Sequence, residues 1–242
     1  MAVLVTRPHP DNEATARALH DRGFAVVLAP MLRFEPVILA DDLGEGHGAI
    51  IVTSANAFRA VEAQLGRLLH LPLFAVGEHT ASEARRLGFG RVIVAGGDAA
   101  KLRERVRKDV GKILGKGGRL LYLAGADLSR DLAGELVGHG FEVEIRTTYR
   151  MVAVSGLPRE IRDAITANEV EAVLHYSQRS ARAFLEAVRA DGVEISALAV
   201  PQCCISANVA AVLREAGALR VLAATSSDEN ALFGVLERAL RP

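Results

Sequence analysis

Six apolar runs of the sequence end in small polar residues, and each of these turns leads into a pattern typical of a helix. If the runs are parallel strands, their carboxyl ends meet along one edge of a sheet, where ligands bind. Free N–H groups at a helix N-terminus favour anions, so six such turns predict a large polyanionic ligand held by main-chain dipoles. Taken singly, each Thr, Ser or Asn is also explained as a helix N-cap. The turns are Val5–Pro8, Val52–Asn56, Val76–Thr80, Leu123–Asp127, His175–Gln178 and Ile205–Asn208.

Short runs rich in β-branched residues alternate with amphipathic helical patterns, which is typical of a parallel α/β architecture. The pattern at 98–114 places its apolar residues on one stripe, the spacing of a single buried face. Gly88 and Gly217 each stand where a helical pattern ends, as a left-handed C-cap requires. The predicted strands are 2–6, 25–29, 49–53, 73–76, 91–95, 119–123, 142–147, 172–176, 203–206 and 220–224.

Similar residues recur at offsets that grow along the chain, which predicts an internal repeat. Offsets that increase in small steps are expected when loops are inserted between two copies. We interpret the pattern as a tandem duplication with five strands in each copy, with chance similarity as the alternative. The matches are Gly23-Phe24 with Gly140-Phe141 at 117, Thr53-Ser54 with Tyr176-Ser177 at 123, and Gly88 with Gly217 at 129.

Two extended, alternating segments, 31–38 and 147–154, belong to no helix–strand unit. We interpret them as two crossings between domains. Domain 1 then combines 1–33 with 154–242, and domain 2, at 38–148, is inserted into it. Paired antiparallel, the two segments form a hinge with a ligand cleft beside it. The expected fold class is α/β, with two flavodoxin-like parallel-sheet domains joined by a two-strand antiparallel linker.

The composition excludes several classes of protein. Of 242 residues, 50% are hydrophobic and 24% are charged, which supports a sizeable core and excludes a disordered chain. Lys and Arg (29) balance Asp and Glu (29), so we expect no nucleic-acid partner. No signal-peptide pattern and no apolar run of membrane-spanning length is found, so we expect no membrane contact. Cys203 and Cys204 are adjacent, which is poor geometry for a disulfide and fits a cytoplasmic protein.

Motifs for nucleotide and metal chemistry are missing from the sequence. No GxGxxG follows a predicted strand, and no GxSxG turn is present. The seven histidines never pair at i and i+4, and there is no Cys-x-x-Cys. We therefore expect neither a cofactor nor a metal, which counts against a flavodoxin-like nucleotide-binding enzyme.

The polar turns also resemble those of the uroporphyrinogen-III synthase family. The similar segments follow one another in order over nearly the whole chain, and their order, spacing and total length make the resemblance specific. The family has a two-domain, cross-connected α/β fold, which agrees with the organisation described above. The segments are 3–8, 51–57, 74–81, 123–127, 148–150 and 225–232.

The resemblance implies a reaction. The family closes hydroxymethylbilane, a linear tetrapyrrole with acetate and propionate groups, into uroporphyrinogen III with loss of water. The last pyrrole ring is inverted through a spirocyclic pyrrolenine, without a cofactor or metal. The substrate also closes unaided to the wrong isomer, so the enzyme mainly has to fold and orient it. This activity belongs to heme and porphyrin biosynthesis.

The resemblance also implies residue roles. Tyr149 is the candidate for assisting departure of the hydroxyl, with an exposed aromatic on the linker as the alternative. One departure from the family concerns the turn 205–209, where Gly-Pro-x-Thr is often found. Ser206 and Asn208 are the substrate-binding candidates there. The other substrate-binding candidates are Thr6, Arg7, Thr53, Ser54, Thr80 and Ser177.

A different class of function stays open at this stage: a two-domain, hinge-closing binding or regulatory protein without chemistry. The two classes differ in whether hydroxymethylbilane is turned over. As partners we expect the polyanionic tetrapyrrole substrate and no second subunit, so a monomer. The pathway leaves room for a transient contact with the preceding enzyme.

Overall fold

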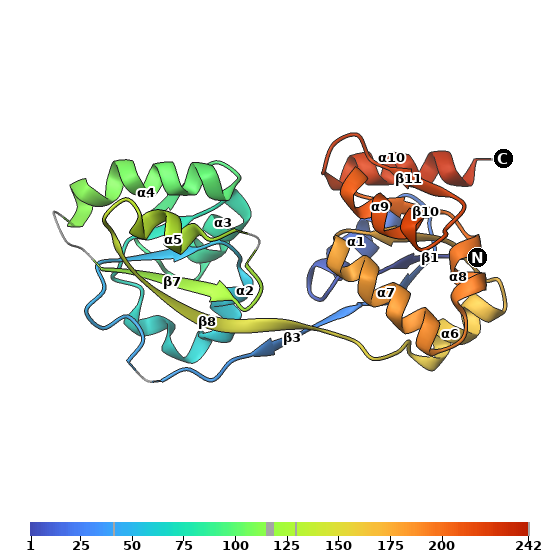
Figure 1. Ribbon diagram of the computed structural model, residues 1–242, viewed down its shortest axis with the longest axis horizontal. Coiled ribbons are helices and arrows are strands. Elements are labelled where there is room, and N and C mark those ends of the chain that lie inside the picture. Colours follow the sequence, from blue (N-terminus) through green and yellow to red (C-terminus); the bar gives the residue numbers. More distant parts are fainter. Residues whose placement is uncertain (41, 115–118, 129, 242) are drawn as a thin grey trace. The chain divides into compact units, whose positions relative to one another are not determined.

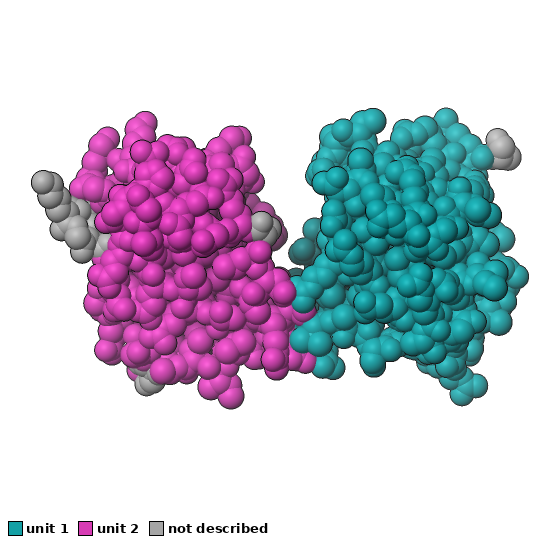
Figure 2. Space-filling view, in the orientation of Figure 1, with its two compact units in different colours: residues 1–34, 152–242 teal, residues 35–151 magenta. Residues whose placement is uncertain are grey.

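The computed structural model describes residues 1–40, 42–114, 119–128 and 130–241. The chain divides into two compact units, coloured separately in Figure 2. Unit 1 combines Met1–Phe34 with Val152–Pro242, and unit 2 is Glu35–Met151. The chain passes between the units twice, and we describe each unit by itself.

Unit 1 is built on a five-stranded parallel sheet in the order β11-β10-β9-β1-β2 (Figure 1). Helices α1 and α10 pack on one face, and α7, α8 and α9 on the other, where α6 packs against α8. The strands are β1 (Ala2–Val5), β2 (Val26–Leu28), β9 (Val170–His175), β10 (Gln202–Cys204) and β11 (Val221–Ala223). The helices are α1 (Asp11–His20), α6 (Arg159–Thr166), α7 (Gln178–Ala190), α8 (Glu194–Ala199), α9 (Ala207–Glu215) and α10 (Glu229–Leu240).

Unit 2 is built on a six-stranded sheet in the order β3-β8-β7-β4-β5-β6 (Figure 1). Helices α4 and α5 cover one face, and α2, α3 and the 3-10 helix η1 cover the other. The strands are β3 (Leu32–Pro36), β4 (Ala49–Val52), β5 (Leu73–Ala75), β6 (Val92–Val94), β7 (Arg119–Gly125) and β8 (Glu142–Ala153). The helices are α2 (Asn56–Ala60), η1 (Glu62–Arg67), α3 (Glu78–Arg86), α4 (Ala99–Leu114) and α5 (Leu132–Val137).

The two predicted connectors, β3 and β8, belong to the six-stranded sheet, and both cross the boundary between the units: β3 begins in unit 1 and β8 ends in it. The Val37 N–H donates to Thr148 O at 2.8 Å and the Val154 N–H donates to Met31 O at 3.1 Å, so β3 and β8 run antiparallel, as predicted. The prediction that strand 142–147 is separate from the second connector is wrong, because β8 continues to Ala153. No Gly or Pro occurs within β8, and its β-branched residues favour continued extension.

Both sheets have the flavodoxin-like strand order 2-1-3-4-5 when β7 and β8 are taken as the first two strands of unit 2. Their pairing registers also agree under the offsets found in the sequence. The common register means that the two sheets are built alike; the duplication itself stays a prediction. The equivalent pairs are Val3–Val26 with Leu120–Val143 (offset 117), Val3–Ala172 with Leu120–Ala49 (offset 123 between β4 and β9), and Gln202–Val221 with Leu73–Val92 (offset 129).

Helix ends follow the local sequence. Ser177 and Ser206 cap α7 and α9 by accepting from the N–H groups of Ser180 and Val209, which satisfies N–H groups that lack a partner within the helix. Gly88 and Gly217 follow α3 and α9 with φ of +100° and +90°, a conformation in which any other residue is strained.

A buried histidine–glutamine pair in unit 1 predicts that stability depends on pH. His175 Nε2 lies 2.9 Å from Gln202 Oε1, and the Gln202 amide N–H groups donate to Ala197 O and Val200 O. Burial lowers the pKa of His175 to about 4, from 6.5. Between about pH 6.5 and 4, His175 is therefore protonated in the unfolded chain but neutral in the folded chain.

We expect the free energy of unfolding to be fully maintained above pH 6.5 and to fall as pH drops towards 4, with this histidine contributing roughly 3 kcal/mol. Denaturant unfolding at pH 7.5, 6, 5 and 4 measures this. The control is His175→Gln, which keeps an N–H donor for Gln202 but cannot titrate. Equal pH slopes for the two proteins would contradict the assignment.

Candidate active site

A cavity of about 400 Å³ opens at the carboxyl ends of β4, β5 and β7 in unit 2. This is the edge of the sheet at which the polar turns were expected to gather a ligand. Part of its wall comes from β8, which runs beyond the end of β7. The residues of its wall used below are Thr53, Asp98, Tyr122, Gly125, Asp127, Arg130 and Tyr149.

Tyr149 lies directly over Gly125. The β7–β8 register shifts there, so that Ala124 pairs with Thr147 but Gly125 pairs with Tyr149. A Cβ at position 125 would be 2.8 Å from Tyr149 Cζ and 2.9 Å from its hydroxyl oxygen. The half-buried Tyr149 ring also packs against the apolar core around β4 and β7. A glycine at 125 is therefore needed for the phenol to occupy this place.

A second tyrosine, Tyr122 on β7, also lines the cavity, and its hydroxyl lies 3.1 Å from Thr53 Oγ1. Burial raises the pKa of Tyr122 above its ordinary value, while the hydrogen bond with Thr53 opposes the shift. Negative charge on the nearby Tyr149 would raise the pKa further. The Tyr122 hydroxyl is therefore neutral at physiological pH and can donate a hydrogen bond.

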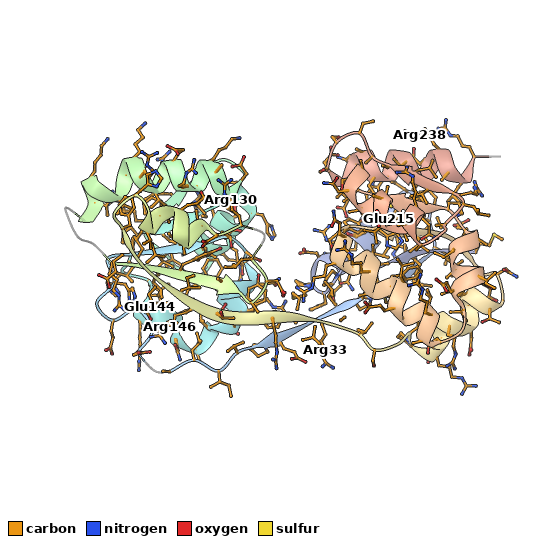
Figure 3. The ribbon with its side chains drawn as sticks, in the orientation of Figure 1. Arg33, Arg130, Glu144, Arg146, Glu215 and Arg238 are labelled. Carbon is orange, nitrogen blue, oxygen red and sulfur yellow. The ribbon has the colours of Figure 1, made fainter. Side chains whose placement is uncertain are left out.

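Ionic groups also line the cavity. The wall includes Asp98, whose carboxylate accepts from the Lys101 N–H at 2.8 Å and caps α4. Arg130 projects from the segment between β7 and α5 (Figure 3) and is held by Glu135, with Nη2 3.0 Å from Oε2. This ion pair keeps the Arg130 pKa above its ordinary value. The wall thus combines one guanidinium group and the N-terminus of a long helix, both suited to anions, with the carboxylates of Asp98 and Asp127.

The sequence candidates in unit 2 divide into two groups. Thr53 and Tyr149 line the cavity. Ser54 Oγ accepts from the Asn56 N–H at 3.3 Å and so stabilises the start of α2. Thr80 is buried in the first turn of α3, with 4% of its surface exposed. Tyr122 was not singled out from the sequence, because a tyrosine within an apolar strand is usually a buried core residue.

Thr6 and Arg7 lie at the carboxyl end of β1 in unit 1. Thr6 is fully buried, and its hydroxyl donates to Leu174 O at 2.9 Å. The Arg7 guanidinium donates to Glu229 at 3.1 Å and to Asp11 at 3.2 Å, and lies 4.9 Å from the centre of the Tyr176 ring. Two carboxylates therefore already compensate the charge of Arg7.

Glu229 is the centre of this cluster in unit 1. Its carboxylate accepts from the hydroxyls of Thr15 and Tyr176, at 2.5 and 3.1 Å, as well as from Arg7. Burial, and then the charge of Glu229, raise the pKa of Tyr176. The sequence signal for Glu229 was its place in the closing segment 225–232, but the contact itself joins distant parts of the chain.

The remaining candidates in unit 1 lie at helix N-termini. Ser177 and Ser206 use their side-chain oxygens as N-caps, and Asn208 is exposed in the first turn of α9. Among the residues that the structure describes, no group of three His, Cys, Asp or Glu side chains is placed to hold a metal ion. Within the same residues, no helix is both long and apolar enough to cross a membrane.

Comparison with known proteins decides the family. The model of the HEM4 family, described as uroporphyrinogen-III synthase HemD, matches residues 13–234. The chain belongs to the uroporphyrinogen-III synthase family. The expected resemblance is therefore confirmed, and with it the assignment to a cyclising lyase of porphyrin biosynthesis. No curated protein sequence matches the chain.

Solved uroporphyrinogen-III synthases share the fold. The enzyme from Helicobacter pylori is 19% identical, with 99% of both chains covered and a TM-score of 0.66. A mutant enzyme from the extremely thermophilic bacterium Thermus thermophilus is 17% identical, with 99% of both chains covered and a TM-score of 0.58. The expected two-domain α/β fold class is confirmed.

Proposed function

We propose that this uroporphyrinogen-III synthase family member converts hydroxymethylbilane into uroporphyrinogen III, and that the hydroxyl leaves in the cavity of unit 2. The observation that carries the proposal is the Tyr149 phenol, held over Gly125 in the wall of a cavity at the carboxyl edge of the sheet. Membership of the family supplies the substrate class. A phenol suits the task because its hydroxyl can donate a hydrogen bond or a proton.

In the proposed step, the carbon–oxygen bond of the hydroxymethyl group breaks, and its electron pair leaves with the oxygen. Tyr149 donates a proton to that oxygen, which departs as water. Attack by the substituted carbon of the last ring then gives the spirocyclic intermediate. The original bond between that carbon and the methylene group of the neighbouring ring breaks, and the methylene carbon bonds instead to the unsubstituted carbon of the last ring, which inverts the ring and closes the macrocycle. The proton that this carbon loses returns to the Tyr149 oxygen. The protein's main contribution is to hold the reacting carbon atoms close together.

The substrate's carboxylates need partners that do not require a strongly basic surface. We propose Arg130 and the first N–H groups of α4 for those that enter the cavity of unit 2. In unit 1 we propose the N-terminal turns of α7 and α9, with Ser177, Ser206 and the exposed Asn208. Thr6 and Arg7 serve instead to order the end of β1, because their polar groups bond within unit 1. We further propose a cytoplasmic monomer that uses neither metal nor cofactor.

The test supplies freshly made hydroxymethylbilane to the purified protein, without added metal, and resolves the oxidised product isomers. Uncatalysed closure in a sample without protein gives the background of type I isomer. We expect type III to replace type I in proportion to protein concentration. Type I product at all protein concentrations would overturn the proposal, and binding without type III formation would favour a non-catalytic binding protein.

A further inference from the structure

The Tyr122–Thr53 pair lies in the same cavity as Tyr149. Tyr122 has no role in the step proposed above, and Thr53 was a candidate for substrate binding only. Tyr122 is fixed on β7, where it pairs with Ile51 of β4, and only 2% of its surface is exposed. The Tyr122 ring packs in the core between the sheet and helices α4 and α5. Tyr122 also forms part of the cavity wall. The ring is therefore rigid, and the hydroxyl has a defined position.

Packing alone does not explain the hydroxyl. A phenylalanine ring would fill the same space in the core, whereas a buried hydroxyl costs free energy unless it is hydrogen-bonded. Thr53 Oγ1 lies 3.1 Å away, and either oxygen can be the donor. When Thr53 donates to Tyr122, the phenolic hydrogen is left to donate to a group within the cavity.

We propose that Tyr122 is a second catalytic phenol, which donates a hydrogen bond to the departing hydroxyl beside Tyr149, and that Thr53 is the residue that positions it. This inference rests on the proposed function. Tyr122 keeps its own proton throughout: Tyr149 supplies the proton that leaves with water, and Tyr122 stabilises the negative charge that develops on the oxygen as the carbon–oxygen bond breaks. Its raised pKa fits a group that stays a donor.

The effect of such a donor belongs to the transition state, so it should be seen in kcat more than in KM. We expect Tyr122→Phe to lower kcat about tenfold, with KM changed less than twofold. The type III product should persist, because the substrate is oriented by the site as a whole. The melting temperature should change little, because the phenylalanine ring fills the same volume.

Thr53 offers a matched pair of variants. Thr53→Val removes the hydroxyl at nearly constant shape and should lower kcat several-fold, whereas Thr53→Ser keeps the hydroxyl and should stay near the wild-type rate. In the double variant Tyr122→Phe/Thr53→Val, kcat should equal that of Tyr122→Phe alone, because Thr53 acts only through Tyr122.

Three results would overturn this inference alone: unchanged kcat in Tyr122→Phe, a change confined to KM, or losses that multiply in the double variant. The last would mean that Thr53 and Tyr122 act independently. A wild-type protein that forms no type III isomer is a distinct outcome, which overturns the proposed function and this inference with it.

Discussion

Tyr149→Phe should lower turnover by at least tenfold and up to about 100-fold, because the variant lacks the proton that assists departure of the hydroxyl. This loss reaches only the lower end of the usual range for general acid catalysis, about 10²–10⁴-fold, because the substrate also closes unaided. The product should remain type III, because orientation comes from the whole site. Initial rates with fresh hydroxymethylbilane, together with resolution of the isomers, measure both effects.

The melting temperature separates chemistry from structure in this variant. The ring of Tyr149 packs against the core of unit 2, and the phenylalanine ring keeps that packing. We therefore expect the midpoint to stay within a few degrees of the wild type. A wild-type rate would remove Tyr149 from the chemistry, and a large fall in the midpoint would make it a structural residue of β8.

Gly125→Ala should be nearly as damaging to turnover as Tyr149→Phe, although it leaves the phenol in place chemically. The new methyl group would lie 2.8 Å from Tyr149 Cζ, which is closer than carbon atoms can approach, so the ring must move away. Displacement of a reacting group by about 1 Å can cost roughly 10²-fold in rate. We expect a loss of at least tenfold in turnover.

The fold should tolerate Gly125→Ala, because the clash is with the far end of a side chain rather than with backbone. Thermal unfolding checks this. Gly111→Ala is the matched control: Gly111 lies within α4, an added Cβ meets nothing within 4 Å, and the change should stabilise the helix by about 0.5–1 kcal/mol without lowering turnover. Full activity in Gly125→Ala would mean that the ring position is not important for the reaction.

The two substitutions test the same assignment in different ways. Tyr149→Phe removes the hydroxyl and keeps the ring where it is, whereas Gly125→Ala keeps the hydroxyl and moves the ring. If Tyr149 acts as a proton donor from a fixed position, both variants lose turnover and both retain the fold. Loss in only one of them would distinguish the need for the hydroxyl from the need for its position.

The sequence by itself determined the elements and much of their order. Each of the ten predicted strands has a counterpart in the sheets, because alternation of β-branched runs with amphipathic stretches is a local property. The caps at Ser177 and Ser206 and the left-handed turns at Gly88 and Gly217 are local as well. Even the common register of the two sheets follows the sequence offsets. Family resemblance also pointed to Tyr149, which lines the cavity; its role in the reaction stays a prediction.

Tertiary structure alone decided which of these residues act together. The Thr53–Tyr122 hydrogen bond joins positions 69 apart, and the Arg7–Glu229 pair joins positions 222 apart. Composition and periodicity indicate that Tyr122 lies in a buried strand and that Arg7 carries a charge. They do not identify the partner of either side chain. Those partners depend on the order of strands in the sheet and on the register shift between β7 and β8, which sets the Tyr149 ring over Gly125. The sequence therefore determines which side chains are present and which local elements they form. Contacts between residues distant in the chain are determined only when the strands pair and the helices pack on the sheets.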